Sequence, residues 1–319
     1  MKTYIAIALA VVGSIGSFGC ASESAQDPSS ESDDSTATQY VGIRDFNNSQ
    51  FDSTWIDVQN QLNGEFANVC GDSFCEGDFS NLTPLSMNCA VTSIRGDVHD
   101  CAWAFAGSLD AVDEDTSVIH VDAPTFQCHF AAKTTASRFI AGVQATDNAL
   151  QTTLPGMTDT IYDTLVDCFQ HPIGASPITF GDDPHPKYVD PLDYYTSAAN
   201  QTKWQNGQAA LKLGFDNICG DTYCDGDFGD IQSMDFNCSV TKSTGKVKSC
   251  DWLFAGSYST VGSKGSVDDV TKEWTCPVTM NGTISQLITT MTTGSDPIQS
   301  PLPGVTTSAY DQIGGCVGR

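Results

Sequence analysis

Apolar residues recur at helical spacing in two stretches of the chain, each ending close to a pair of cysteines. Steps of three or four residues place such side chains on one face of a helix. The apolar residues are Phe51, Trp55, Val58, Leu62 and Phe66 in the first stretch, and Trp204, Leu211 and Phe215 in the second. A Cys-Gly-Asp segment follows each stretch, at residues 70–72 and 219–221, and we expect it to end the helix.

Alternation of apolar and polar residues follows each helix and predicts strands with one buried face. Glycines at positions 96 and 245 mark the turn between two such strands in each half. The alternating sets are Leu85, Met87, Cys89, Val91 and Cys101, Trp103, Phe105 in the first half, and Met234, Phe236, Cys238, Val240 and Cys250, Trp252, Phe254 in the second. Phe126 and Cys128 suggest a third strand, and helical spacing resumes at Phe139. The pattern therefore predicts an α+β fold, a small antiparallel sheet with helices in each half.

The two halves repeat each other in sequence as well as in pattern. CGDSFCEGDF at residues 70–79 corresponds to CGDTYCDGDF at 219–228, and CAWAFAGS at 101–108 corresponds to CDWLFAGS at 250–257. The spacing of six cysteines is nearly the same in both copies. The chain is therefore predicted to contain two tandem homologous modules, residues 43–170 and 193–319.

The cysteines fall into two equal sets after the one near the N-terminus is set aside. An even set in an exported chain predicts a disulfide framework, here three bonds in each module. The twelve residues are Cys70, Cys75, Cys89, Cys101, Cys128 and Cys168 in the first module, and Cys219, Cys224, Cys238, Cys250, Cys276 and Cys316 in the second. A bond between Cys89 and Cys101 would join facing strands, but the sequence leaves the connectivity open. Zinc is disfavoured because neither copy has a CxxC pair and the second has no histidine.

Residues 171–192 join the modules and contain several prolines, which predicts a semi-stiff spacer. With such a spacer, we expect each module to fold and to bind its partner independently of the other.

The chain is strongly acidic, with 39 Asp and Glu residues against 14 Lys and Arg residues and a formal net charge of -25. Nucleic-acid binding needs clustered cations, so this class of partner is excluded. The same charge disfavours docking on anionic lipid.

The N-terminus has the pattern of an export signal. Lys2 precedes the apolar run from Ile5 to Val12, which is too short to span a bilayer. Small residues follow and lead to Gly19-Cys20. This ending resembles the lipobox of Gram-negative bacterial lipoproteins, although Ser17 stands where that family favours Leu. The resemblance covers residues 1–20 and implies acylation of Cys20 and, with Ala21 next, an outer-membrane location. Cleavage after Ala21 would instead release a secreted protein.

Residues 21–42 follow this signal and are rich in serine and acidic residues. They cannot bury apolar surface, so they are predicted to form a disordered tether.

Carboxylates near the Cys-Gly-Asp segments are the candidate metal ligands. Several hard oxygen ligands close together can bind Ca²⁺. The candidates are Asp72, Glu76 and Asp78 in the first module, and Asp221, Asp225 and Asp227 in the second. The EF-hand pattern is not met, and the alternative is that these side chains cap turns. No other cofactor is expected.

No catalytic arrangement is shared by the two copies. The five histidines lie outside the second module, so a duplicated triad or metal-hydrolase centre is excluded. An enzyme confined to the first module would need a polar pocket around His99 or His129. Arg95-Gly96-Asp97 is an integrin-type tripeptide in the predicted turn, which we interpret as a chance turn sequence. Trp103 and Trp252 are expected in the core.

These patterns favour a non-enzymatic binding or structural protein, exported and anchored through Cys20. Its ligand would be an unknown protein or glycan, and the membrane would be reached only through the N-terminal lipid. A secreted proteinase or enzyme inhibitor and a calcium-binding surface module are the alternatives.

Overall fold

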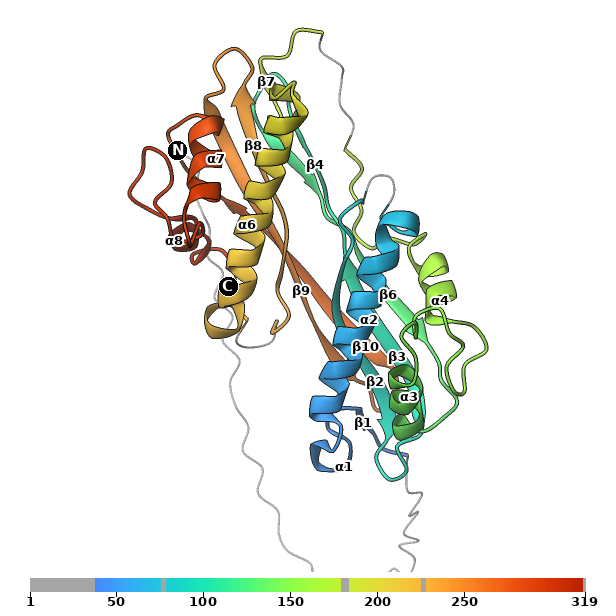
Figure 1. The fold of residues 1–319 in the computed structure, drawn as a ribbon. Helices are drawn as coiled ribbons and strands as arrows, with labels where there is room; N and C mark the ends of the chain where they lie inside the picture. Colours follow the sequence, from blue (N-terminus) through green and yellow to red (C-terminus); the bar gives the residue numbers. More distant parts are fainter. Residues whose placement is uncertain (1–37, 76–78, 179–183, 225–227, 318–319) are drawn as a thin grey trace, which may run out of the picture. The chain divides into compact units, whose positions relative to one another are not determined.

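A computed structural model describes residues 38–75, 79–178, 184–224 and 228–317. These residues form two halves, each with a four-stranded antiparallel sheet and helices (Figure 1). The predicted α+β fold class with disulfides in each module is confirmed. The expected signal, the lipid site Cys20 and most of the tether lie outside the described residues.

The first half orders its sheet β1-β2-β3-β6, and its helices lie before and after the strands in sequence. The strands are β1 (Tyr40–Gly42), β2 (Thr83–Thr92), β3 (Val98–Ala106) and β6 (Thr125–Phe130). The helices are α1 (Phe46–Ser49), α2 (Asp52–Ser73), α3 (Ala136–Gln144) and α4 (Ile161–Cys168).

The second half repeats this plan with the order β10-β9-β8-β7. Its strands are β7 (Tyr188–Val189), β8 (Gln232–Thr241), β9 (Val247–Val261) and β10 (Val267–Pro277). Its helices are α5 (Pro191–Tyr194), α6 (Ala198–Thr222), α7 (Ile284–Thr293) and α8 (Ala309–Ile313).

Helix α2 covers one face of the first sheet with the stripe that its sequence predicts. Trp55, Val58 and Leu62 are fully buried, and Phe66 is nearly so. Burial of such side chains stabilises the fold by about 1.5–3 kcal/mol each. The Trp55 indole N–H donates to the Met87 carbonyl oxygen at 3.1 Å, which satisfies the one polar atom of this side chain. Helix and sheet are therefore held together by apolar burial and by a buried hydrogen bond.

The long helices end one residue after the Cys-Gly-Asp segments, as the sequence predicts, so each segment forms the last turn of its helix and not a turn beyond it. Helix α2 continues to Ser73 and α6 continues to Thr222. The Cys70 carbonyl oxygen accepts from the Phe74 and Cys75 amides at 3.0 and 2.7 Å. Cys75 is also disulfide-bonded to Cys70. These links hold the last turn in place despite the flexibility of Gly71.

A β-bulge in each sheet changes which face one predicted residue occupies. In β2 the register shifts between Pro84 and Met87, so Leu85 does not share a face with Met87 as the alternation predicts. Leu85 packs against the second half of the chain, where Met234 lies next to an equivalent shift in β8.

The sheet faces that carry no helix pack against each other. Their shared apolar cluster is formed mainly by small and medium-sized side chains, which let the two sheets approach closely. The buried members are Leu85, Ala104, Ala106, Met234, Leu253 and Ala255. The two halves therefore share one buried interface, which the prediction of independent modules does not include.

A hairpin arm from each half reaches across the other half. In the first half the arm is the separate pair β4 (Leu109–Val112) and β5 (Ile119–Asp122). In the second half the ends of β9 and β10 continue past the sheet, as Figure 1 shows. The arm tips dock at equivalent places, because the Gly265 carbonyl oxygen lies 3.1 Å from His99 Nδ1 and the Ser117 carbonyl oxygen accepts from Ser249 Oγ at 2.8 Å.

The module boundaries also differ from the predicted ones. Strand β1 begins at Tyr40, within the predicted tether, and strand β7 begins at Tyr188, within the predicted spacer. Ile173 exchanges backbone hydrogen bonds with Thr125 at the other end of the spacer. Both ends of the spacer are therefore part of the folded structure, because each adds backbone hydrogen bonds to a strand.

Among the described residues, no helix combines the length and the apolar character needed to cross a membrane.

Candidate functional site

All twelve module cysteines are paired, and each pair lies within one half. The bonds are Cys70–Cys75, Cys89–Cys101 and Cys128–Cys168 in the first half, and Cys219–Cys224, Cys238–Cys250 and Cys276–Cys316 in the second. The predicted disulfide framework is confirmed, and the connectivity is the same in both copies.

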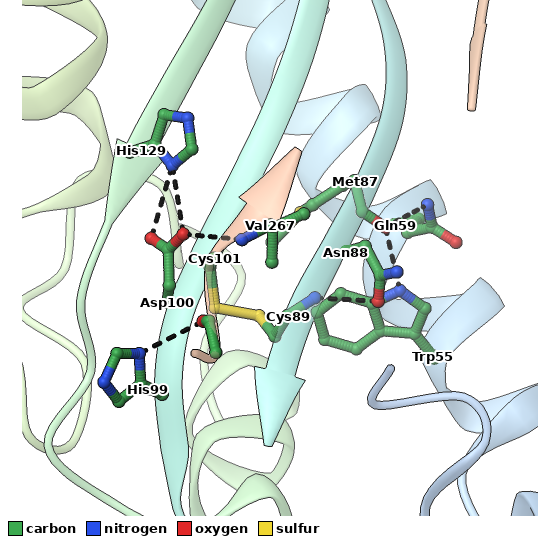
Figure 2. Close-up of a disulfide and its surroundings, with 11 residues drawn as sticks. Trp55, Gln59, Met87, Asn88, Cys89, His99, Asp100, Cys101, His129 and Val267 are labelled. Carbon is green, nitrogen blue, oxygen red and sulfur yellow. Dashed lines mark hydrogen bonds and ion pairs between the residues drawn. A yellow bond between two sulfur atoms is a disulfide. The ribbon is translucent and has the colours of Figure 1, made fainter. Parts of the chain in front are cut away.

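The cross-strand bond joins facing residues of β2 and β3. Cys89 and Cys101 are register partners with their Cα atoms 4.0 Å apart. Figure 2 shows this bond between α2, which carries Trp55, and a polar group around Asp100. The bond therefore links β2 to β3, the two strands that supply the first half's buried residues of the shared apolar cluster.

The calcium prediction falls largely outside the described residues. Glu76, Asp78, Asp225 and Asp227 lie outside them altogether. The backbones of Asp72 and Asp221 belong to the last turns of α2 and α6, but their side chains are not described. In the described part of the chain, no group of three or more His, Cys, Asp or Glu side chains is placed to hold a metal ion.

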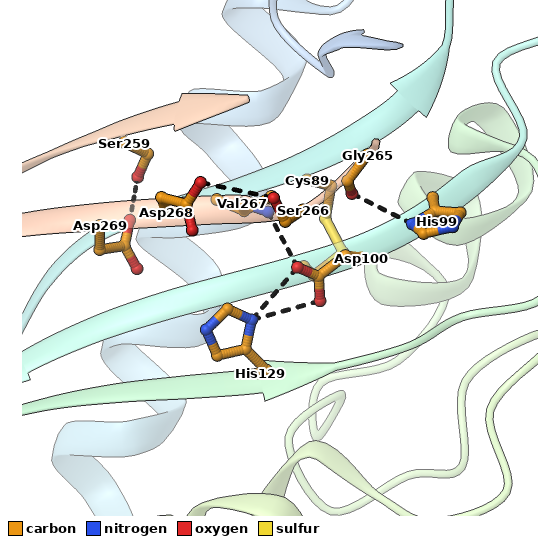
Figure 3. A network of polar contacts seen from close by, with 11 residues as sticks. Cys89, His99, Asp100, His129, Ser259, Gly265, Ser266, Val267, Asp268 and Asp269 are labelled. Carbon is orange, nitrogen blue, oxygen red and sulfur yellow. Dashed lines mark hydrogen bonds and ion pairs between the residues drawn. A yellow bond between two sulfur atoms is a disulfide. The ribbon is translucent and has the colours of Figure 1, made fainter. Parts of the chain in front are cut away.

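His99 and His129 of the first module lie where the second arm docks (Figure 3), whereas His120 lies on β5 of the first arm. Asp100 accepts from the Val267 backbone amide at 2.9 Å and lies 3.2 Å from His129 Nδ1. His99 contacts the Gly265 carbonyl oxygen and packs edge-on against Tyr40 at 4.9 Å between ring centroids. These side chains hold the tip of the β9–β10 arm against the first sheet.

The His129–Asp100 pair is electrostatically coupled. Burial raises the pKa of Asp100, but hydrogen bonds from His129 and from the Val267 amide outweigh it, so the pKa lies below its usual range. The hydrogen bond to Asp100 raises the pKa of His129, against the effect of partial burial. Among the described contacts, the pair hydrogen-bonds the Val267 backbone amide and no serine or cysteine side chain. Its role in these contacts is therefore to hold the arm against the sheet.

A hydroxyl-rich group, which we call the serine junction, lies where β2 meets β9. It consists of Ser86, Ser257, Ser259, Asp230 and Asp269. The Ser86 amide donates to Ser257 Oγ at 2.9 Å, and the Asp230 carboxylate accepts from the Ser257 amide and hydroxyl at 2.6 and 2.7 Å. Ser259 donates to Asp269, whose pKa burial raises to about 6.

A carboxylate-rich group, the aspartate junction, occupies the equivalent place where β4 meets β8. Asn237 donates its side-chain amide to Asp110 at 2.9 Å and to Asp190 at 2.6 Å. Burial, together with the neighbouring charge of Asp235, raises the pKa of Asp110 to about 7. Burial also raises the pKa of Asp190 to about 6. Burial, with a smaller contribution from neighbouring carboxylates, therefore favours the protonated forms of both groups.

A groove opens beside the serine junction, with a volume of about 470 Å³. Helix α2 forms one wall with Gln59, Asn60 and Asn63, and the second half forms the other with Gln232 and Tyr258. Residues from both halves are needed to enclose it. This groove is the candidate binding site.

The integrin-type tripeptide and the paired tryptophans lie where the sequence placed them. Arg95 and Asp97 flank the β2–β3 turn and form an ion pair with each other at 2.6 Å. The Asp97 carboxylate is therefore bound within the turn. Trp103 and Trp252 are fully buried.

The two arms and the groove between the halves were missed by the sequence reasoning. One available signal was the repeated Tyr-Val pair, at Tyr40-Val41 and Tyr188-Val189, which marks the edge strand of each sheet. The two arms span nearly the same number of residues, but after the shared Gly-Ser at residues 107–108 and 256–257 their sequences largely diverge. No local pattern in either arm indicates that it packs on the other half.

Comparison with protein-family models, with curated proteins and with solved structures found no match to this chain.

Proposed function

We propose that this chain is a non-enzymatic binding protein of the bacterial cell envelope, exported and anchored through a lipid on Cys20. The observation that carries the proposal is the joining of two disulfide-bonded halves into one unit with a polar groove between them. A rigid unit with a preformed concave surface is suited to binding.

Export is supported by the six disulfides, which form and persist in oxidising compartments. The lipid anchor is supported by the lipobox-like Gly19-Cys20 and the acidic serine-rich segment after it. A polar segment of this composition would hold the folded halves away from the membrane surface.

A binding role rather than catalysis is supported by the roles of the polar side chains. His99 and His129 hold the second arm, and equivalent positions in the second half carry Lys248 and Pro277. The groove supplies mainly amides and hydroxyls, which form hydrogen bonds but are weak acids and bases.

The anchor is tested by expressing the full chain and its Cys20→Ser variant in a Gram-negative host with labelled palmitate. We expect label on the native chain only, together with its recovery in the outer-membrane fraction. The control is a Ser22→Ala variant, which leaves the cysteine in place and should be labelled like the native chain. A soluble, unlabelled mature protein beginning at Ser22 would contradict the anchor and indicate cleavage after Ala21.

A further inference from the structure

The groove beside the serine junction has the dimensions of a small-ligand site. Its volume of about 470 Å³ lies within the range of about 300–1,000 Å³ that such sites occupy. Its walls come from α2 and β2 of the first half and from β8 and β9 of the second. The groove therefore exists only because the two halves pack against each other.

The polar groups of the groove are suited to ligand hydroxyls. An amide side chain offers both donors and an acceptor, and a hydroxyl offers both as well. Asn60 and Asn63 line the groove from α2, and neither side chain hydrogen-bonds another described residue. The Asp230 carboxylate is oriented by Ser257 and keeps lone pairs for further donors. Donors and acceptors are thus presented together.

Apolar surface lies next to these polar groups. Ile56 is 43% exposed at the groove, although it is a large hydrophobic residue. Pro84 and the Tyr258 ring add further apolar wall. A sugar ring has the matching character, since its C–H groups form an apolar face and its hydroxyls surround the edge.

Charge and backbone pairing argue against other ligand classes. Arg44 at the rim is ion-paired with Asp52 at 2.6 Å, while Asp230 adds a carboxylate, so an anionic ligand is disfavoured. An extended peptide would need a free strand edge. Strand β1 pairs with β2 only at residues 90–92, but at the groove the Met87 carbonyl oxygen of β2 already accepts from the Trp55 indole and the Gln59 amide, both at 3.1 Å. At the β2 bulge the Ser86 amide donates to Ser257 Oγ. A neutral, hydroxyl-rich ligand fits best.

The repeat does not provide a second copy of this chemistry. The positions of Ser86 and Ser259 correspond to Asp235 and Asp110 of the aspartate junction. There the side-chain amide of Asn237 already donates hydrogen bonds to two carboxylates, those of Asp110 and Asp190. Binding is therefore expected at one site in the chain, although the modules are duplicated.

We propose that the groove binds a short neutral oligosaccharide, with its hydroxyls on Asn60, Asn63 and Asp230 and its apolar face on Ile56 and Tyr258. This inference rests on the proposed binding role and names the ligand class for it.

The test uses isothermal titration calorimetry on the full chain carrying Cys20→Ser, which keeps it free of lipid. The neutral probes are chitotetraose and cellotetraose, and the acidic probe is tetragalacturonate. We expect a neutral probe to bind with one site per chain and more tightly than the acidic probe. The double variant Asn60→Ala/Asn63→Ala should weaken this binding about tenfold or more, because two hydrogen bonds are lost. Asn68→Ala on the same helix, outside the groove, should change it less than about twofold.

Three results would overturn the oligosaccharide assignment: no binding of either neutral probe at millimolar concentrations, tighter binding of tetragalacturonate, or equal effects of the groove and control variants. Thermal unfolding of each variant identifies a loss that comes from misfolding, and in that case Asn63→Gln, which keeps the amide but lengthens it, replaces the double variant. Palmitate labelling is independent of these results, so the envelope assignment would stand if the ligand assignment failed.

Discussion

Single side chains make the two junctions of this molecule chemically different, although they occupy equivalent places in the repeat. Hydroxyls at Ser86 and Ser259 share their hydrogen bonds with neighbours and remain neutral. At the equivalent Asp235 and Asp110, burial disfavours the ionised carboxylates, and repulsion from Asp235 adds to this at Asp110. Both junctions therefore contain buried carboxylates that make stability depend on pH, and the carboxylate with the higher pKa, Asp110, lies in the aspartate junction.

Asp110→Asn is expected to stabilise the protein at alkaline pH. The pKa of Asp110 is raised from 3.8 to about 7 by burial and by Asp235, Asp190 and Asp251, so its contribution to stability is present below pH 3.8 and is lost as pH rises through 7. Asparagine keeps an oxygen acceptor for Asn237 and carries no charge. We expect a gain of about 1–3 kcal/mol in the free energy of unfolding at pH 8 and almost none at pH 4.

Urea unfolding of the native chain and the variant at several pH values measures this difference. The other groups that affect this site include Lys212, which lowers the pKa of Asp235, and they remain in both proteins. Asp115→Asn, at the exposed tip of the same arm, removes one charge without removing a buried one and serves as the control. A difference of the same size at pH 4 and pH 8 would show that Asp110 does not titrate in this range.

At the scale of helices and strands, local patterns were sufficient wherever burial involves one half alone. The stripe from Trp55 to Phe66 and the alternation through Cys101, Trp103 and Phe105 each identify an element that packs within its own module. The patterns failed where burial comes from the other half. Leu85 alternates with Met87 in sequence but faces the other way, because a bulge shifts the register. The groove could not be predicted, since its walls are far apart in sequence.

The disulfides that close the longest and the shortest loops are expected to differ in how much they stabilise the fold. Cys128–Cys168 closes a loop with a sequence separation of 40, and Cys70–Cys75 closes one with a separation of 5. Loop-closure entropy gives about 4 kcal/mol for the long loop and about 2 kcal/mol for the short one. Replacing each pair with alanine and measuring urea unfolding should reproduce this order. The pairs Cys276–Cys316 and Cys219–Cys224 have the same separations and should behave alike. Equal costs for long and short loops would contradict the prediction.

Docking of the second arm is expected to make Gly265 intolerant of a side chain. Gly265 has a φ of +85°, and a Cβ there would lie 2.8 Å from Tyr40 Cε1 and 2.9 Å from His99 Nδ1. Gly265→Ala should lower the free energy of unfolding by about 2–4 kcal/mol, from backbone strain and from steric conflict. Gly174→Ala is a matched control, because its φ is +77° and no atom lies within 4 Å of the added Cβ. It should cost only the strain, about 1 kcal/mol, in the same thermal unfolding measurement. Equal losses would show that the arm tip is not docked in solution.

At the scale of the whole described unit, the two halves depend on each other in a way that a tandem repeat with a spacer would not. Each half buries its helix-free sheet face against the other, through Leu85 and Ala104 on one side and Leu253 on the other. Each arm then docks on the opposite half, so the contact resembles a symmetric dimer interface within one chain. Disulfides stabilise each half separately, but the apolar cluster joins them.

Separating the halves should therefore expose an apolar face on each of them. Residues 38–178 and 184–319, produced as two chains under oxidising conditions, are expected to self-associate or to unfold at lower temperature than the intact protein, because the cluster around Ala104 and Leu253 loses its partner. Mixing them should restore a one-to-one complex, which size-exclusion chromatography with light scattering would detect.

The matched control introduces Ala104→Glu into the first chain. A carboxylate buried at that position has no partner, so the complex should not form. Two stable, monomeric halves with no affinity for each other would contradict this account and restore the prediction of independent modules. In that case the groove would also lose its second wall, since Gln232 and Tyr258 reach α2 only through this interface.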